Sequence, residues 1–259
     1  MSELVRLSTP ADGVTVVTLD NPPLNLVTVD LIDQLEETLT DIAADRSTRA
    51  VILASTGDRA FCAGSDVAEF MDIRDDVVAR KSRRENGVWR ALELLPQPTI
   101  AAIAAPAVGG GFELALCCDM RVVAETAWFA FPELNLAVYP GSGGTYRLAR
   151  LVGLTRAFEL LYTGDRLDSA TALEWGVASE VTPADTVLGR AVERATQLAA
   201  APALAVQAVK QAVYASCGRS WEDVEPLLLA LTERVFASED VVEGVAAFRE
   251  RRAPNFRHR

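Results

Sequence analysis

Two glutamates lie in settings where a carboxyl group could do acid–base chemistry. Glu113 follows the run Gly109-Gly110-Gly111, and Glu133 follows the apolar segment Phe129-Ala130-Phe131-Pro132. Burial favours the neutral form of one carboxyl group, whereas hydrogen bonds keep another ionised. Such a pair can divide the work of acid and base between its members. Taken singly, each glutamate also has an ordinary explanation as an acidic residue at the start of a helix.

Two glycine-containing segments each lead from a strand-like run into a helical pattern, and both could expose backbone amides. In Ala60-Phe61-Cys62-Ala63-Gly64-Ser65-Asp66, Gly64 lets the chain turn and present the Ser65 amide. In Gly109-Gly110-Gly111, the free N–H groups of the first helical turn face outward. Two such amides that converge on one point would form an oxyanion hole. Either motif alone is more often a tight turn into a helix, and neither matches a dinucleotide fingerprint or a phosphate-binding loop.

Composition limits the possible ligands. The 259-residue chain is long enough for a large buried core, as one large domain or two small ones. Its net charge of −11 argues against a nucleic-acid partner, so an anionic ligand would need a local basic patch. For any single arginine, a solvated face or an ion pair is the more common arrangement. The candidate patches are Arg80-Lys81-Ser82-Arg83-Arg84 and the group Arg249, Arg251, Arg252, Arg257 and Arg259.

Histidine and cysteine usage narrows the chemistry further. His258 is the only histidine, which nearly excludes a His-based triad or a His-rich zinc site, and we expect no metal. The longest apolar run, 99–108, is too short to cross a membrane, and the N-terminus lacks the pattern of a signal peptide. We therefore expect a cytoplasmic protein with no membrane partner. Free thiols in a reducing compartment are expected for the four cysteines, which form no C-x-x-C pair: Cys62, Cys117, Cys118 and Cys217.

Strand and helix patterns alternate in the first half of the chain. The helical patterns cover 28–44 and 111–118. Because the apolar runs between them are continuous, parallel strands joined by helices are the simplest account. The predicted strands are 14–19, 50–54, 99–104 and 120–124.

The second half is helical in pattern from Gly143 onward, apart from a strand-like run over 177–181. These helices are amphipathic, so each must bury one face against the strand-rich core or against a second copy of the chain. The segment Ala199-Ala200-Ala201-Pro202 predicts a break between two of them. The predicted helices are 183–200, 203–215, 221–237 and 240–252.

The order of these motifs resembles the enoyl-CoA hydratase/isomerase (crotonase) superfamily over nearly the whole chain. The resemblance implies an α/β fold, with a spiral of ββα repeats over 1–200 and a helical region over 201–259. It further implies that the helical region forms a homotrimer, commonly a dimer of trimers. The motifs that carry the resemblance are Phe61–Asp66, Pro98–Ile103, Gly109–Leu116, Phe131–Glu133, Pro140–Gly144, Leu161–Asp165, Ala172–Gly176 and Ala247–Arg251.

The resemblance also implies roles for single residues. The amides of Ser65 and Gly110 would hold the carbonyl of an acyl-CoA thioester. Glu113 would deprotonate the water that attacks C3 of a trans-2-enoyl thioester, and protonated Glu133 would deliver a proton to C2. The Gly141 amide would position the water or the acyl group. The backbone of Ala63, Asp66 and Val67 would cradle the adenine of coenzyme A, which is part of the substrate, so no separate cofactor is expected.

Local chemistry fits this division of labour. Aromatic neighbours would favour the neutral form of Glu133. The helix dipole would favour the ionised form of Glu113. Because isomerases of this superfamily often keep only one carboxylate, the pair favours hydration of 2-enoyl-CoA to 3-hydroxyacyl-CoA. The alternatives are a carnitinyl-CoA-type dehydratase, an enoyl-CoA isomerase, or a non-catalytic acyl-CoA-binding protein.

Some positions depart from the superfamily pattern. Ala137 stands where a glycine is frequent, and Tyr146 stands where many members have glutamine. An extra methyl group and a phenol near the acyl group could narrow the pocket, although Tyr146 could equally pack on a helix face. These departures affect the expected shape of the substrate more than the expected class of reaction.

Overall fold

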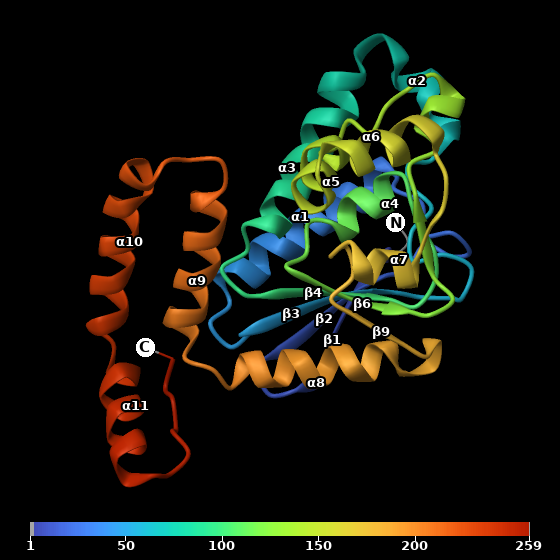
Figure 1. Cartoon of the computed structure of the whole chain (residues 1–259). Helices are drawn as coiled ribbons and strands as arrows, with labels where there is room; N and C mark the ends of the chain where they lie inside the picture. Colours follow the sequence, from blue (N-terminus) through green and yellow to red (C-terminus); the bar gives the residue numbers. More distant parts are fainter. Residues whose placement is uncertain (1–2, 259) are drawn as a thin grey trace.

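The computed structural model describes residues 3–258 and has two β-sheets surrounded by helices (Figure 1). In the larger sheet, β1 pairs antiparallel with β2, and all other neighbours are parallel. Parallel pairing agrees with the continuous apolar runs of the sequence, and β1 is the exception. The strand order is β1 (Val5–Ala11), β2 (Val14–Leu19), β3 (Ala50–Ser55), β4 (Thr99–Ile103), β6 (Met120–Ala124) and β9 (Glu180–Thr182).

The smaller sheet consists of three short strands that the sequence did not predict. β7 pairs parallel with β5 and antiparallel with β8. Runs of two or three residues are too short to show a period of two, so their pairing depends on distant segments of the chain. The strands are β5 (Ala107–Val108), β7 (Trp128–Ala130) and β8 (Leu167–Asp168).

Helices cover both faces of the larger sheet (Figure 1). α1 (Val29–Ala44) begins at Thr28, whose hydroxyl caps the Leu31 amide at 3.2 Å. α8 (Val187–Ala199) packs against β3, β4 and β6 on the opposite face. Its buried stripe of alanines allows the helix to approach the sheet closely. The predicted helices 28–44 and 183–200 are therefore confirmed to within a few residues.

An irregular helical segment follows the 60–66 segment. Short helical turns lead from α2 (Phe70–Ile73) through a π-helical turn (Val78–Ser82) into α3 (Arg83–Glu93). Neither α3 nor the π-helical turn was predicted from the sequence. π-helical turns are rare and are often found at functional sites.

The next four helices along the chain, α4 to α7, are short. α4 (Gly110–Ala115) begins at the triple glycine and is shorter than the predicted 111–118. α5 (Gly144–Val152) begins at the end of the glycine-rich segment 140–144 and packs against α6 (Leu154–Thr163). α7 (Ser169–Glu174) precedes β9, which lies slightly later than the predicted strand 177–181.

The last three helices project from the core (Figure 1). α9 (Ala203–Ser216) packs against α10 (Trp221–Phe236), and α11 (Glu239–Glu250) follows. The break over 199–202 is confirmed, because α8 ends at Ala199 and α9 begins at Ala203. The division of the chain at residue 200 into two regions stays a prediction.

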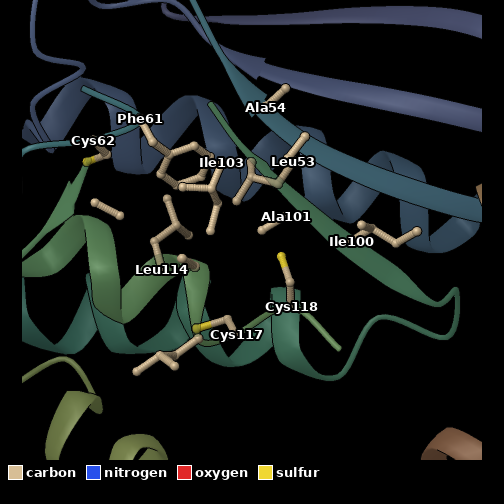
Figure 2. Packing of buried hydrophobic residues seen from close by; sticks show 14 of the residues in the cluster. Leu53, Ala54, Phe61, Cys62, Ile100, Ala101, Ile103, Leu114, Cys117 and Cys118 are labelled. Atoms are coloured by element: carbon tan, nitrogen blue, oxygen red, sulfur yellow. The ribbon is translucent and has the colours of Figure 1, made fainter. Parts of the chain in front are cut away.

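The hydrophobic core brings the two glycine-containing segments together (Figure 2). Phe61 and Cys62 precede Gly64, Leu114 lies on α4, and all three side chains belong to one buried cluster. Residues of β3 and β4 complete this part of the cluster, including Leu53 and Ile103. Packing therefore fixes the positions of both segments relative to the sheet.

Candidate active site

Two backbone amides lie side by side where the glycine-containing segments meet. The Val108 amide donates to the Cys62 carbonyl at 2.9 Å, which holds the segments together. Gly64 has φ +90°, and a methyl group built on it would lie 3.2 Å from the Gly110 nitrogen. A methyl group on Gly110 would lie 3.6 Å from the Ser65 nitrogen. The structure thus brings the predicted Ser65 and Gly110 amides into one small region.

The surroundings leave these two amides suited to an external acceptor. Gly110 is the first residue of α4, so its N–H has no carbonyl partner within the helix. The amides on either side of the Gly64-Ser65 turn are already used: Ala63 donates to Leu24 and Asp66 donates to Val27. The arrangement has the form of an oxyanion hole.

Gly111 permits the contact on which this arrangement depends. A methyl group on Gly111 would lie 2.1 Å from the Cys62 carbonyl oxygen and 2.6 Å from its carbon. No side chain fits at such distances, so α4 can approach the 61–66 segment only with glycine at this position.

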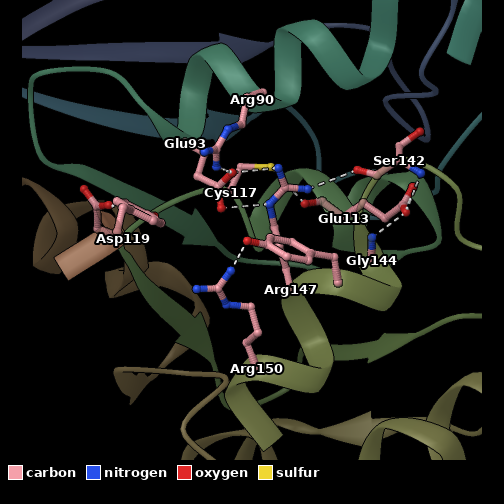
Figure 3. A network of polar contacts seen from close by, with 11 residues as sticks. Arg90, Glu93, Glu113, Cys117, Asp119, Ser142, Gly144, Arg147 and Arg150 are labelled. Atoms are coloured by element: carbon pink, nitrogen blue, oxygen red, sulfur yellow. Dashed lines mark hydrogen bonds and ion pairs between the residues drawn. The ribbon is translucent and has the colours of Figure 1, made fainter. Parts of the chain in front are cut away.

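Glu113 is buried on α4 and held by the glycine-rich segment 140–144 (Figure 3). Its Oε1 accepts hydrogen bonds from the Ser142 amide at 2.9 Å and the Gly144 amide at 2.7 Å. Gly144 must be glycine for this contact, since a methyl group there would lie 2.9 Å from Glu113 Oε1. The carboxyl group therefore has a fixed position.

Burial raises the pKa of Glu113 to about 8, and the nearby charges of Glu85 and Glu133 contribute. The two amide hydrogen bonds oppose this rise. Burial therefore opposes the helix dipole, which was expected to favour the ionised form of Glu113. α4 has only six residues, and removal of the carboxylate from water outweighs the field of so short a helix.

Glu133 approaches the same region from another segment. It begins the 3₁₀ turn Glu133–Leu136 after Pro132. A methyl group built on Gly109 would lie 3.0 Å from Glu133 Oε1, so this carboxyl group lies at the start of α4. Its Oε2 is buried and accepts no hydrogen bond from any residue within 3–258. Burial raises the pKa of Glu133 to about 7, as its apolar neighbours predicted.

A third buried carboxyl group, Glu85, was missed from the sequence. It lies in the first turn of α3, and only 3% of its surface is exposed. A methyl group on Gly110 would lie 3.6 Å from Glu85 Oε1, which places this oxygen beside the paired amides. Burial raises the pKa of Glu85, and a hydrogen bond from the Ser142 side chain partly offsets that rise. No sequence motif marked this position.

A buried ion pair supports the segment that binds Glu113 (Figure 3). Arg147 Nη2 lies 3.0 Å from Glu93 Oε2, and both side chains are at least nine-tenths buried. Arg147 Nη1 also donates to the Ser142 carbonyl at 3.1 Å. Loss of either partner would leave an unpaired buried charge, so the pair holds Arg147 in place. Arg147 in turn holds the 140–144 segment through the Ser142 carbonyl. No sequence pattern predicted the pair.

The remaining predicted binding residues lie next to the two segments just described: Ala63, Asp66 and Val67 flank the Gly64-Ser65 turn, and Gly141 precedes Ser142. The Asp66 side chain accepts from the Ala68 amide at 2.9 Å, and Val67 is exposed. Ala63 is partly exposed next to Gly64. The Gly141 carbonyl accepts from Asn86 Nδ2 at 3.2 Å, and it is the amides of Ser142 and Gly144, not that of Gly141, that bind Glu113.

The predicted basic cluster over 80–84 is not a single patch. Lys81 is buried, donates to the Val27 carbonyl at 3.0 Å and lies 3.4 Å from Glu69. Arg84 pairs with Asp33 instead. In the C-terminal group, Arg252 follows the end of α11 and pairs with Glu243 and Glu250 of that helix. Within residues 3–258, no arginine is identified by its contacts as a site for coenzyme A phosphates; Arg259 lies outside the described residues.

The two departures from the superfamily pattern have clear local settings. Ala137 has φ +57°, a conformation that favours glycine, at the end of the 3₁₀ turn that carries Glu133. Tyr146 lies on the exposed face of α5, where Arg150 stacks on its ring at 4.6 Å. Tyr146 and Arg150 line a cavity of about 540 Å³ between the core and α9, whose described lining residues include none of Ala137, Glu113 and Glu133. Tyr146 therefore packs on a helix face.

Residues 3–258 contain no cluster of three or more metal-ligating side chains. No helix within the same residues is both long and apolar enough to cross a membrane.

Known proteins match the chain over nearly its full length. A family model described as enoyl-CoA hydratase/isomerase matches residues 9–259. The chain is 37% identical over 249 residues to the probable enoyl-CoA hydratase echA8 of Mycobacterium tuberculosis, which covers 95% of each chain. It is 34% identical over 246 residues to the mitochondrial enoyl-CoA hydratase of Pongo abelii, covering 94% of this chain and 83% of the other.

A solved structure gives the same result for the fold. The enoyl-CoA hydratase of Bacillus anthracis superposes with a TM-score of 0.95 at 34% identity, covering 99% of this chain and 100% of that one. The α/β spiral with its helical C-terminal region is therefore a crotonase fold, as predicted. The chain belongs to the enoyl-CoA hydratase/isomerase family.

Proposed function

We propose that this protein is an enoyl-CoA hydratase that catalyses the reversible syn addition of water to trans-2-enoyl-CoA. The observation that carries the proposal is the proximity of two carboxyl groups on one helix start: partly buried Glu133 lies at the beginning of α4, the helix that presents the Gly110 amide and carries buried Glu113, and its charge raises the pKa of Glu113. Family membership supports an acyl-CoA thioester as substrate. Retention of both carboxyl groups favours water chemistry over double-bond isomerisation.

The paired amides account for stabilisation of the intermediate. The thioester oxygen accepts hydrogen bonds from the Ser65 and Gly110 amides, and it becomes an enolate oxygen when water adds to C3. Preorganised donors need no reorientation as this charge develops, and loss of one such donor typically costs about 3 kcal/mol of barrier.

The carboxyl pair accounts for proton transfer. The two carboxyl groups titrate as a coupled pair, and the form that reacts has Glu113 ionised and Glu133 protonated. Glu113 takes a proton from water as the water oxygen bonds to C3, and electrons move from the C2–C3 double bond to the thioester oxygen. Protonated Glu133 then gives its proton to C2 as the thioester carbonyl re-forms. The pair holds one proton before and after the reaction, so its net charge is unchanged.

Coenzyme A binds at the rim of the same site in this proposal. The backbone of Ala63, Asp66 and Val67 cradles the adenine, and the Gly141 amide positions the water or the acyl group. Coenzyme A is part of the substrate, and the reaction written above needs no further cofactor.

The C-terminal helices assemble trimers in this proposal, alone or as a dimer of trimers. Several large apolar side chains on α10 and α11 are exposed in the single chain, which supports burial against further copies. They include Trp221, Leu229, Phe236, Val242 and Phe248.

A cytoplasmic location is the remaining part of the proposal. Cys62, Cys117 and Cys118 are buried free thiols, and Cys217 is an exposed free thiol. Unpaired cysteines are typical of reducing compartments.

Turnover of enoyl-CoA substrates tests the proposal. Purified protein is mixed with crotonyl-CoA and longer trans-2-enoyl-CoAs, and loss of the conjugated thioester absorbance is followed. Hydration of at least one of them, with 3-hydroxyacyl-CoA as product, is expected. Double-bond migration without uptake of water would instead identify an isomerase, and turnover only of a hydroxylated acyl-CoA would identify a dehydratase. Coenzyme A binding without any turnover would identify a binding protein.

A further inference from the structure

The segment that holds Glu113 is itself held by α3. The amides of Ser142 and Gly144 bind the Glu113 carboxylate, so the position of the 140–144 segment sets the position of that group. Two consecutive α3 residues contact the segment: the Ser142 side chain donates to Glu85, and Asn86 Nδ2 donates to the Gly141 carbonyl at 3.2 Å.

Glu85 has the burial and orientation of a functional group. A solvated glutamate would serve equally well at the start of a helix, yet Glu85 is 97% buried and its Oε1 lies beside the paired amides of Ser65 and Gly110. Burial of a carboxyl group is costly unless its charge or hydrogen bonds are compensated. A π-helical turn over 78–82 lies directly before α3, and such turns are rare and often found at functional sites.

We propose that Glu85 is a positioning residue of the active site, which fixes Ser142 and thereby holds the Glu113 carboxylate for attack by water on the enoyl thioester. This inference rests on the hydratase function proposed above. It gives a third carboxyl group a role that differs from those of the proposed base and acid.

The charges around Glu85 determine its effect on Glu113. Lys81 from the π-helical turn and Glu69 from the preceding segment face Glu85 with opposite charges. Glu113 faces it from α4, and the Cys62 thiol faces it from the 61–66 segment, with a pKa that Glu85 helps to raise. The charge of Glu85 also raises the pKa of Glu113, so loss of that charge should let Glu113 ionise at a lower pH.

The test compares Glu85→Leu and Glu85→Gln with Asn86→Ala. Glu85→Gln removes the charge but keeps an oxygen that accepts from Ser142, whereas Asn86→Ala removes a neighbouring contact with the same segment and leaves every charge in place. We expect Glu85→Leu, which removes the acceptor for Ser142, to lower kcat about 10-fold or more with little change in KM. Glu85→Gln should keep most of the wild-type kcat and move the pH profile of kcat/KM to lower pH. Asn86→Ala should lower kcat without moving the profile. A wild-type kcat in folded Glu85→Leu, or an unmoved profile in Glu85→Gln, would overturn the inference.

Two further measurements keep the inference testable. Ser142→Ala removes the same hydrogen bond from the other side and should also lower kcat; a wild-type kcat in this folded variant would overturn the positioning role. If wild-type protein hydrates no enoyl-CoA, the proposed function fails separately, and infrared titration of protonated carboxyl groups without substrate still tests Glu85. In that titration, Glu85→Gln should lower the midpoint of the carboxyl group that disappears in Glu113→Gln, and an unmoved midpoint would refute the coupling.

Discussion

Replacement of Glu113 by glutamine should abolish hydration and stabilise the fold at alkaline pH. Burial raises the pKa of this carboxyl group from 4.5 to about 8, so the folded protein binds its proton more tightly than the unfolded chain does. The stability that the proton provides is fully present below pH 4.5, and it is lost as the pH rises from 4.5 through about 8. At about 1.4 kcal/mol for each tenfold difference in proton affinity, the ionised group costs the folded state up to about 5 kcal/mol above pH 8.

The expected gain in the variant is smaller than this limit. Glutamine keeps an oxygen that can accept from the Ser142 and Gly144 amides, but its amide group must find a partner at a buried site. We therefore expect Glu113→Gln to raise the free energy of unfolding by about 3 kcal/mol at pH 9 and by less than about 1 kcal/mol at pH 5.

Denaturant unfolding at both pH values measures this difference. Protein concentration is held constant, because assembly would add to the apparent stability. Glu222→Gln, on the exposed first turn of α10, is the matched control and should leave the free energy of unfolding nearly unchanged. A Glu113→Gln variant that gains no more stability at pH 9 than at pH 5 would refute the electrostatic account of the site.

Three further outcomes follow from the structure. The wild-type pH profile of kcat/KM should be bell-shaped with its maximum between pH 7 and 8. The pKa values are about 8 for Glu113 and about 7 for Glu133, so the form of the carboxyl pair with a single proton predominates in that interval. A profile that is flat from pH 6 to 9 would contradict this. Gly111→Ala should destabilise the protein by about 3 kcal/mol in denaturant unfolding, since its methyl group would meet the Cys62 carbonyl, whereas Gly189→Ala, in open space on α8, should stabilise it by about 0.5–1 kcal/mol; equal effects would refute the close-approach argument. Ala137→Gly should raise the free energy of unfolding by about 0.5–1 kcal/mol because it relieves a positive φ, and a destabilised variant would show that no strain is present there.

The sequence was most informative where chemistry and backbone geometry depend on neighbouring residues. Gly64 and Gly110 marked turns that expose amides, and the continuous apolar runs predicted the parallel strands of the larger sheet. Local pattern also predicted the break at 199–202, because Pro202 lacks the N–H group that a continuing helix needs.

The sequence was least informative where function depends on contacts between distant segments. Glu85 is 57 residues away from Ser142, and nothing in the α3 sequence indicates that this carboxyl group is buried. The pKa of Glu113 depends in the same way on burial and on the charges of other segments, which a helix-dipole argument leaves out. Such terms become visible only when the fold brings the segments together.

The rate of crotonyl-CoA hydration in three matched proteins tests the central claim most directly. Wild-type protein, Glu113→Gln and Glu133→Gln are compared at pH 7.5, with binding of coenzyme A measured in parallel. The two-carboxyl account predicts that each variant binds coenzyme A as the wild type does and loses kcat by about 10²-fold or more. Wild-type kcat in either folded variant would contradict it.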